Sequence, residues 1–465
     1  MTFINLRPKP SIFIKSIAEQ GYTLESALAD LIDNSITSSA SEVNLVSGMM
    51  HGNHCMFIAD NGDGMSDNTL LEALRMPSQS MENARLSKDL GRFGLGLKTA
   101  SFSQARKVTV ISKIENQDQY CAYCWDLKYL EEDWNLKKLD NNEIEQYLSA
   151  FNQRKSEANL NSTLNLSTLI VWEDLFKYDN VTLLDQHLME ETIGYLSLVF
   201  HRFLDRSSIR ITIGNVDLRG FDPFPDDMSR MQKVRFYKDE RFSVQGFILP
   251  YTVLKYKSGN GLKQWVIGNR TLSDMEGIYL YREDRLICFG GWARLQRRQQ
   301  HLKLARLKID IYNTHDKLFE INVAKSMMRI PQQFSKQILE IVRELSAQSK
   351  AVYFQRSVKT LFSDPQIKRE SILNSHIDQT GVYFSVNENN QIYKSLLDSV
   401  MSKTNKKILR NYLLEIMKVL NTHVDNDNGE IEDLPKTRKD KFTDEEVRKL
   451  KEIGLSDFDI ENLKN

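Results

Sequence analysis

This chain of 465 residues is long enough for two or three domains, and 41% of its residues are hydrophobic. Lys plus Arg and Asp plus Glu both number 62, so the formal net charge is zero and gives no overall basic signal for nucleic-acid binding. No run of about 18 uncharged apolar residues occurs, so we expect no membrane span and no membrane partner. Arg7, Lys9 and Lys15 interrupt the N-terminal segment, so we expect no signal peptide and a cytoplasmic protein.

The use of cysteine also fits a reducing compartment, with four cysteines in the whole chain. Cys121 and Cys124 form a CxxC pair, which in isolation suggests zinc or redox chemistry. Residues 120–127 favour a strand, however, and positions i and i+3 of a strand face opposite sides. Because no second CxxC follows, we interpret the pair as ordinary reduced cysteines.

The first informative segment is residues 29–34, Ala-Asp-Leu-Ile-Asp-Asn. Apolar residues at helical spacing surround it, and Thr23 stands where an N-cap would be, so we expect a helix here. Asp30 and Asn34 then share one face. A carboxylate can activate water, and a carboxamide oxygen can bind Mg²⁺. The alternative is an amphipathic helix with two ordinary polar residues.

A second segment follows a short apolar strand expected at residues 54–59. Asp60 stands at its end, where a carboxylate can accept a hydrogen bond from an exocyclic amine such as that of adenine. Gly62 and Gly64, next to Met65, let the backbone turn sharply and let a flat ring approach closely. A calcium loop is excluded, because the two glycines occupy positions that need oxygen ligands. An ordinary Asn-Gly or Asp-Gly turn is the alternative.

The third segment is residues 91–98, Gly-Arg-Phe-Gly-Leu-Gly-Leu-Lys, before a helix expected at residues 97–102. Glycine amides, a helix start and a lysine all suit phosphate. The segment is not a P-loop, because Leu97 stands where the lysine should follow Gly96, and one residue turns a helix by about 100°. It is not a Rossmann motif, because Thr99 replaces the third glycine.

These three segments, in this order and with a strand at residues 167–172, resemble the GHKL ATPases: the gyrases, the ninety-kilodalton heat-shock chaperones, the histidine kinases and MutL. Within that superfamily, residues 91–101 are most similar to the MORC branch and its bacterial relatives. The resemblance covers roughly residues 1–350. It implies an α+β protein whose N-terminal α/β sandwich, of the Bergerat type, binds ATP with Mg²⁺.

The resemblance assigns roles to individual residues. Asn34 matches the asparagine that holds Mg²⁺, and Asp60 matches the residue that binds adenine, supported by Gly64 and Thr168. Further positions matched to nucleotide binding are Gly62, Met65, Gly91, Phe93, Gly94, Leu95, Gly96 and Lys98. Residues 66–96 resemble the lid that closes over bound ATP. The phosphate partner in this lid is left open among Arg75, Lys88 and Arg92.

One departure concerns the general base, usually a glutamate in this superfamily and here Asp30. Aspartate is one methylene shorter, and a misplacement of roughly 1 Å can cost about a hundredfold in rate. We expect Asp30 to act as the base with slow turnover, and Asp33 is an alternative.

We expect the first domain to end near residue 180. The second region, residues 181–350, resembles the S5-like transducer domain of the same superfamily. The elements expected in it are a helix at 183–203, strands at 209–212, 242–249, 265–268 and 304–311, a hairpin at 277–281 and 285–289, and a helix from 332 to about 350. The resemblance also implies that a lysine of this region contacts the γ-phosphate. Lys325, within residues 320–326, is the candidate for this catalytic role.

Residues 294–308 contain six Lys or Arg and no acidic residue. Such a stretch could bind DNA phosphates in a salt-sensitive manner, be a solvated loop or receive an acidic partner. Residues 351–465 are expected to be mostly helical, with a strand at 382–386, a linker near 421–441 and a short helical pair after it.

Together these features predict an ATP-dependent conformational clamp that hydrolyses ATP to ADP and phosphate. The resemblance implies that two chains form a homodimer when ATP binds. It also implies that DNA or a partner nuclease or other defence protein is the client, in bacterial anti-phage defence. The alternatives are an ATP-sensing interaction module that does not hydrolyse ATP, and a chaperone-like ATPase.

Overall fold

The computed structural model describes residues 9–18, 21–75, 96–114, 117–130, 133–160, 162, 164–224, 232–238, 242–255, 260–311, 330–361, 373–378, 381–400, 405–407, 409–414 and 416. Several expectations fall outside these residues. They concern the lid from residue 76 to 95, the linker at 421–441 with the helical pair after it, and the positions Gly91, Phe93, Gly94, Leu95 and Lys325, together with Lys88 and Arg92.

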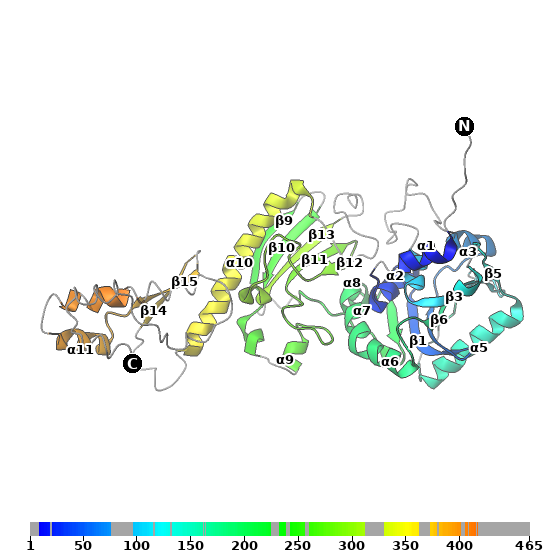
Figure 1. Ribbon diagram of the computed structural model, residues 1–465, viewed down its shortest axis with the longest axis horizontal. Coiled ribbons are helices and arrows are strands. Elements are labelled where there is room, and N and C mark those ends of the chain that lie inside the picture. Colours follow the sequence, from blue (N-terminus) through cyan, green and yellow to red (C-terminus); the bar gives the residue numbers. More distant parts are fainter. Residues whose placement is uncertain are drawn as a thin grey trace. The chain divides into compact units, whose positions relative to one another are not determined.

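The N-terminal part of the chain folds around a mixed eight-stranded sheet (Figure 1) with the order β5-β4-β3-β6-β2-β1-β7-β8. Its strands are β1 (Glu42–Met50), β2 (Asn53–Asp60), β3 (Ala105–Ser112), β4 (Cys121–Asp126), β5 (Lys137–Lys138), β6 (Thr168–Leu175), β7 (Arg210–Ile213) and β8 (Val216–Asp217). Neighbouring strands are antiparallel except β1 and β7, which are parallel.

Helices cover both faces of this sheet. They are α1 (Pro10–Ala18), α2 (Leu24–Thr37), α3 (Asp67–Leu74), α4 (Gly96–Phe102), α5 (Asn141–Glu157), α6 (Val181–His187), α7 (Ile193–Val199) and α8 (His201–Asp205). A π-helical turn, η2 (Leu188–Thr192), joins α6 to α7, so the helix expected at 183–203 is confirmed with an irregular middle.

Alternation along the strands produces two hydrophobic cores, one on each face of the sheet. On one face, Ile58 of β2 and Val110 of β3 pack with Ile32 of α2. On the other face, Phe57 of β2 packs with Phe151 of α5. Helix α2, which carries two of the predicted site residues, is therefore held by its apolar side against the sheet.

The N-cap predicted for α2 is confirmed. The Thr23 hydroxyl accepts a hydrogen bond from the Ser26 backbone N–H at 3.2 Å, and the Ser26 hydroxyl accepts one from the Thr23 N–H at 3.0 Å. This capping box satisfies two N–H groups at the start of the helix and fixes where it begins.

The CxxC pair lies on β4, and its two side chains face opposite cores. Cys121 packs against the core that contains α2, and Cys124 is buried in the core that contains α5. Both are free thiols. The predicted opposite orientation of the two thiols is therefore confirmed, and in this arrangement they cannot share a metal ion. Their reduced state stays a prediction.

A second sheet contains five strands in the order β12-β11-β13-β10-β9. The strands are β9 (Gln232–Lys238), β10 (Phe242–Ile248), β11 (Gly277–Arg282), β12 (Arg285–Phe289) and β13 (Ala305–Ile311), accompanied by helices α9 (Asn260–Lys263) and α10 (Gln332–Leu361). The predicted hairpin is confirmed as β11 and β12, paired antiparallel. Three short 3₁₀ turns also occur, η1 (Leu127–Tyr129), η3 (Tyr251–Lys255) and η4 (Gln300–Leu304).

Two of the expected strands are placed differently. The strand expected at 265–268 is wrong: Trp265 and Val266 both donate backbone hydrogen bonds to the Leu262 carbonyl, as in a helical turn. A short buried apolar run does not distinguish a strand from other buried structure. The strand expected at 209–212 exists as β7, but it joins the first sheet beside β1.

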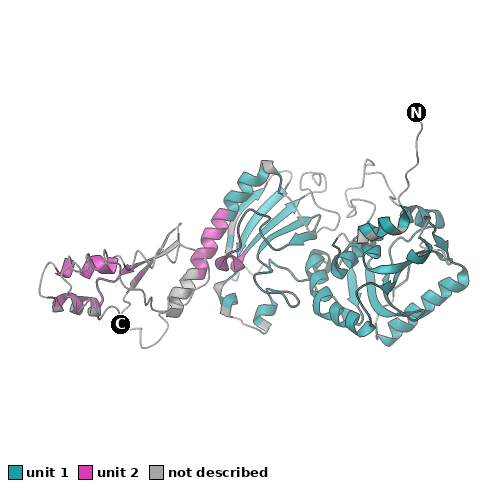
Figure 2. Cartoon of the chain, viewed as in Figure 1, with its two compact units in different colours: residues 1–296, 306–342 teal, residues 297–305, 343–465 magenta. Residues whose placement is uncertain are grey.

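The chain divides into two compact units (Figure 2), residues 1–296 with 306–342 and residues 297–305 with 343–465. The second unit contains the hairpin of β14 (Leu373–Asp378) and β15 (Gly381–Val386) and the helix α11 (Gln391–Ser399). The mixed α+β class is as predicted, whereas the domain boundaries at 180 and 350 stay predictions. Among the described residues, none of the helices has the length and hydropathy that a membrane crossing requires.

Candidate functional site

Asp60 ends β2 and is buried, with 7% of its surface exposed. One carboxylate oxygen accepts a hydrogen bond from the Gly62 backbone N–H at 3.0 Å, and the other accepts one from the Ser35 hydroxyl at 2.9 Å. Burial raises the pKa of Asp60, and these two hydrogen bonds offset part of that increase. Ser35 lies on α2, so this contact joins the first predicted segment to the second.

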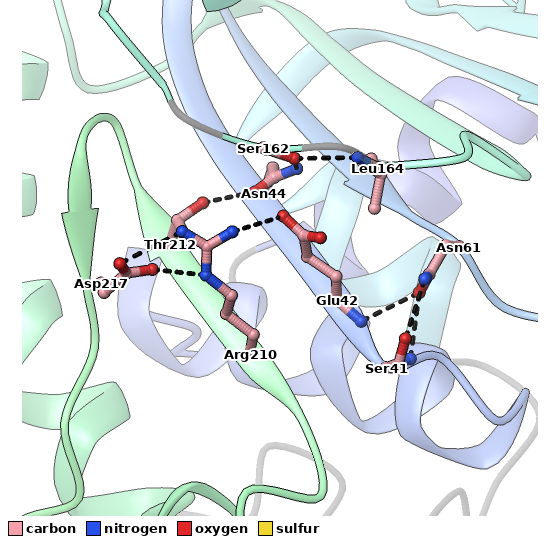
Figure 3. Close-up of polar contacts among 9 residues, drawn as sticks. All are labelled: Ser41, Glu42, Asn44, Asn61, Ser162, Leu164, Arg210, Thr212 and Asp217. Carbon is pink, nitrogen blue, oxygen red and sulfur yellow. Dashed lines mark hydrogen bonds and ion pairs between the residues drawn. The ribbon is translucent and has the colours of Figure 1, made fainter.

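The turn after Asp60 is fixed by the next residue, Asn61 (Figure 3). Its side-chain oxygen accepts hydrogen bonds from the backbone N–H groups of Ser41 and Glu42, at 3.0 and 2.9 Å, and its amide donates to the Ser41 hydroxyl. Figure 3 also shows Arg210 of β7 between Glu42 and Asp217, with ion-pair distances of 3.1 and 2.7 Å. The end of β2 is therefore attached to the start of β1, and β1 to β7.

Both glycines of the second segment are required by close backbone contacts. A Cβ atom on Gly64, whose φ is +68°, would lie 1.8 Å from the Lys113 carbonyl oxygen. A Cβ atom on Gly62 would lie 2.6 Å from the Ser38 carbonyl oxygen. Only glycine fits at these positions, and the turn is thereby packed against both α2 and the end of β3.

Thr168 of β6 pairs with Asp60 across the sheet. Its hydroxyl lies 2.9 Å from the hydroxyl of Ser112, which also accepts a hydrogen bond from the Met65 backbone N–H at 3.0 Å. Thr168 thus reaches the turn through Ser112, a residue that the sequence analysis missed. The available signal was a serine ending an apolar strand beside the predicted site.

Asp30 is buried on α2, with 6% of its surface exposed. The Tyr22 hydroxyl donates a hydrogen bond to one Asp30 carboxylate oxygen at 2.9 Å and lies 3.4 Å from the Thr99 hydroxyl. Thr99 belongs to α4, which starts at Gly96 in the third predicted segment. The structure therefore brings the first and third segments together through Tyr22, which was not predicted as a site residue.

Asn34 lies one turn after Asp30 on the same helix, and its side chain is exposed. An exposed carboxamide fits Mg²⁺, which keeps several waters and takes most other ligands from phosphates. In the described part of the chain, no group of three or more His, Cys, Asp or Glu side chains is arranged to hold a metal ion. A magnesium ion here would therefore depend on Asn34 and on the nucleotide itself.

Asp33 forms a buried ion pair with Arg285, the first residue of β12. The Arg285 Nε atom lies 3.1 Å from each carboxylate oxygen, and the two side chains are only 1% and 2% exposed. Burial, the largest single influence, opposes the charge of Arg285, but the interactions with Asp33, Tyr195 and Asp30 together outweigh it and raise the arginine pKa. Because Arg285 engages both oxygens, the geometry does not support Asp33 as the alternative general base.

Lys98 is buried on α4, with 2% of its surface exposed. Its amine donates hydrogen bonds to the carbonyl oxygens of Ala73, at 3.0 Å, and Arg75, at the C-terminal end of α3. Burial lowers the pKa of Lys98 to about 8. The Lys98 amine thus caps carbonyl groups at the C-terminal end of α3. The Arg75 side chain is exposed and pairs with Glu72.

The six cations of residues 294–308 do not all lie on the surface. Arg306 is buried and donates hydrogen bonds to the carbonyl oxygens of Pro223 and Trp265, and Lys308 is half-buried. The exposed cations are Arg294, Arg297 and Arg298. The six cations therefore do not form one surface patch, because Arg306 of β13 lies in the interior. The choice among a DNA site, a solvated loop and a site for an acidic partner stays open.

Comparison with known proteins supports the assignment of the first region. Residues 22–158 match the family model described as histidine kinase-, DNA gyrase B-, and HSP90-like ATPase. The matched span includes Tyr22, the helix of Asp30 and Asn34, the turn of Asp60 and the helix of Lys98. No curated protein matches the chain. Residues 22–158, which include helix α2 and the turn after Asp60, therefore match a GHKL-type ATPase domain.

Proposed function

We propose that this protein is a slow ATPase that works as an ATP-dependent conformational clamp. The observation that carries this proposal is the Ser35–Asp60 hydrogen bond, which joins the helix of Asp30 and Asn34 to the turn of Gly62 and Gly64. One helix can therefore serve both the base and the phosphates of a bound nucleotide. The matched family model over residues 22–158 supports the same activity.

Each residue takes a role that its position supports. Asp60 accepts a hydrogen bond from the adenine amine, with the glycine turn and Thr168 behind it. Asn34 offers a carboxamide oxygen to Mg²⁺, which when bound neutralises phosphate charge. Asp30 accepts the proton of the attacking water, and the Tyr22 hydroxyl holds one of its oxygens. The shorter aspartate then accounts for slow turnover.

The clamp step extends this proposal to residues that the structure does not describe, within 76–95 and 312–329. The superfamily resemblance supports a lid over residues 66–96, with Gly91, Phe93, Gly94 and Leu95 contacting the nucleotide, and a γ-phosphate contact from Lys325. The first unit joins the ATPase sheet to a second sheet, for which we propose the S5-like transducer role. ATP binding would then bring two chains together as a homodimer, and hydrolysis would release them.

The client is proposed from the surface and from the MORC resemblance. Arg294, Arg297 and Arg298 are exposed and can contact DNA phosphates. A partner nuclease or other defence protein in the cytoplasm, within anti-phage defence, is the setting that the resemblance supports. This part rests on analogy between families and not on the site.

A second candidate is an ATP-sensing module that does not hydrolyse ATP. The short Asp30 side chain, buried and hydrogen-bonded to Tyr22, favours it. Single-turnover assays separate the two functions, because the module would bind ATP tightly and produce no phosphate. A chaperone-like ATPase, the third alternative, would show no salt-sensitive DNA binding.

The decisive experiment measures the mass of the protein in solution with and without a non-hydrolysable ATP analogue, in the presence and absence of DNA. We expect a monomer without nucleotide, a dimer with the analogue, and tighter DNA binding in the dimer. Asn34→Ala is the matched control and should lose the Mg²⁺-dependent response. A wild-type protein that binds no ATP would overturn the proposal, and a monomer with ATP bound would remove the clamp.

A further inference from the structure

The hairpin of β11 and β12 contacts the helix of the site at one buried ion pair. Arg285 and Asp33 are 252 positions apart in the sequence, and the Arg285 Nε atom lies 3.1 Å from both oxygens of Asp33. The Arg285 guanidinium also lies against the Phe200 ring, 5.6 Å from its centroid, and donates to the Leu286 carbonyl oxygen. Arg285 is thus fixed in one orientation.

The turn of this hairpin is fixed from a second direction. Its two central residues, Glu283 and Asp284, have φ angles of +45° and +71°, a conformation that favours glycine or asparagine. Asp284 is held by Arg202 of α8, at 3.2 Å, and by Arg206, the C-cap residue of that helix. Adjacent residues of the hairpin, an acid and a base, therefore form ion pairs with two different helices of the first sheet.

The position of Asp33 on α2 gives the buried pair its significance. Asp33 lies three residues after Asp30 and one before Asn34, so a rotation of α2 that moves Asp33 also moves both proposed functional residues. A buried charge without its partner is strongly unfavourable, so Asp33 and Arg285 must move together. The exposed Arg206–Asp284 pair has no such constraint.

We propose that Arg285 is a positioning residue, which acts through Asp33 to fix the rotation of α2 and so couples the second sheet to Asp30 and Asn34. This inference rests on the proposed ATPase function. It makes the hairpin the route by which a change in the second sheet alters hydrolysis, independently of any residue in the 312–329 segment. Arg285 itself contacts no substrate atom in this role.

The test compares Arg285→Met, Arg285→Lys and the double variant Asp33→Asn with Arg285→Met. Arg206→Met is the matched control, because it removes an arginine that pairs with the same hairpin on the surface. Thermal melting, nucleotide affinity with and without Mg²⁺, and single-turnover hydrolysis are measured for each at a temperature at which it is folded.

We expect Arg285→Met to lower turnover at least tenfold and to lose the Mg²⁺-dependent part of nucleotide affinity, with the Mg²⁺-free affinity unchanged within threefold. Arg285→Lys should recover part of the turnover. The double variant should recover melting temperature, because no isolated charge remains buried, but not turnover. Arg206→Met should match wild type within twofold.

Two results would overturn the inference alone. One is turnover in Arg285→Met within twofold of wild type, and the other is full recovery of turnover together with stability in the double variant, which would make the pair purely structural. Absence of nucleotide binding in the wild type would instead overturn the proposed function. If the wild type binds ATP but does not hydrolyse it, the test uses the Mg²⁺-dependent part of nucleotide affinity in the same variants. Loss of this part in Arg285→Met supports the inference, and its retention overturns the inference.

Discussion

At the Asp60 end of the site, the supporting groups come from neighbouring strands, from the turn itself and, through Ser35, from α2. Thr168 lies opposite Asp60 on the adjacent strand, and Ser112 lies beside Thr168 on the next. At the Asp30 end, the supporting groups arrive from separate elements. Tyr22 precedes α2, Thr99 is on α4, and Arg285 is on a strand of the second sheet.

From this difference we expect that nucleotide affinity and the rate of ATP hydrolysis can be changed independently. Strand pairing and the glycine turn, which do not involve the second sheet, hold the Asp60 end together with Ser35. We therefore expect this end to keep binding nucleotide when the second sheet moves. The Asp30 end depends on side chains whose elements can shift, so it should respond to conformational change. Variants at the two ends should therefore fail in different measurements.

The largest effect is expected at the hydrolytic end. Asp30→Asn removes the proposed proton acceptor and should lower turnover by about 10²- to 10⁴-fold, with nucleotide affinity changed less than about threefold. Phosphate release in single-turnover assays and calorimetric titration measure the two quantities. Asp30→Glu, which restores the usual length of the base, should keep or raise turnover. Undiminished hydrolysis in Asp30→Asn would assign the base to another group.

The next effect tests the adenine end. Asp60→Asn keeps the size of the side chain but loses the charged acceptor, so we expect affinity to fall by about 10- to 150-fold, equivalent to about 1.5–3 kcal/mol. Titration with ATP and with GTP checks it, since GTP lacks the matching amine. An unchanged ATP affinity would show that the adenine lies elsewhere.

Lys98 provides a test through pH. Its pKa is about 8 in the folded chain and about 10.5 when unfolded, so the unfolded chain binds the proton more tightly. The folded protein therefore gains stability as the pH rises from about 8 towards 10.5, and below pH 8 the penalty is constant. Relative to Lys98→Met, wild type should gain about 1–2 kcal/mol between pH 7.5 and 9.5.

Denaturant unfolding at each pH measures this gain. The matched control is Lys128→Met, which removes a lysine from the exposed surface by the same substitution. A constant difference between wild type and Lys98→Met across this range would show that the amine is not desolvated.

The smallest effect concerns the hydroxyl that holds Asp30. Tyr22→Phe removes one hydrogen bond to the carboxylate and should lower turnover by about 5- to 10-fold, equivalent to about 1 kcal/mol, without changing nucleotide affinity. Tyr147→Phe is the control, because the Tyr147 hydroxyl also donates to a buried carboxylate, that of Glu173, on the opposite face of the sheet. Equal losses in both variants would point to a general loss of stability.

Short stretches of contiguous residues were enough to predict several features of this protein. The N-cap at Thr23, the helical spacing of Asp30 and Asn34, and the placement of Asp60 at a strand end follow from periodicity and turn chemistry over a few positions. The same holds for the hairpin of β11 and β12. Each of these features depends on residues close together in the sequence, so it does not depend on how distant segments pack.

Which buried polar groups meet depends on how the folded chain packs and could not be predicted from the sequence. Three such contacts join Ser35 to Asp60, Tyr22 to Asp30 and Asp33 to Arg285. Asp33 and Arg285 are 252 positions apart in the chain. A buried polar group without a partner is unfavourable, so each must find one, but its identity depends on which segments the packing brings near. Packing between distant segments likewise placed β7 in the first sheet and Arg306 in the interior.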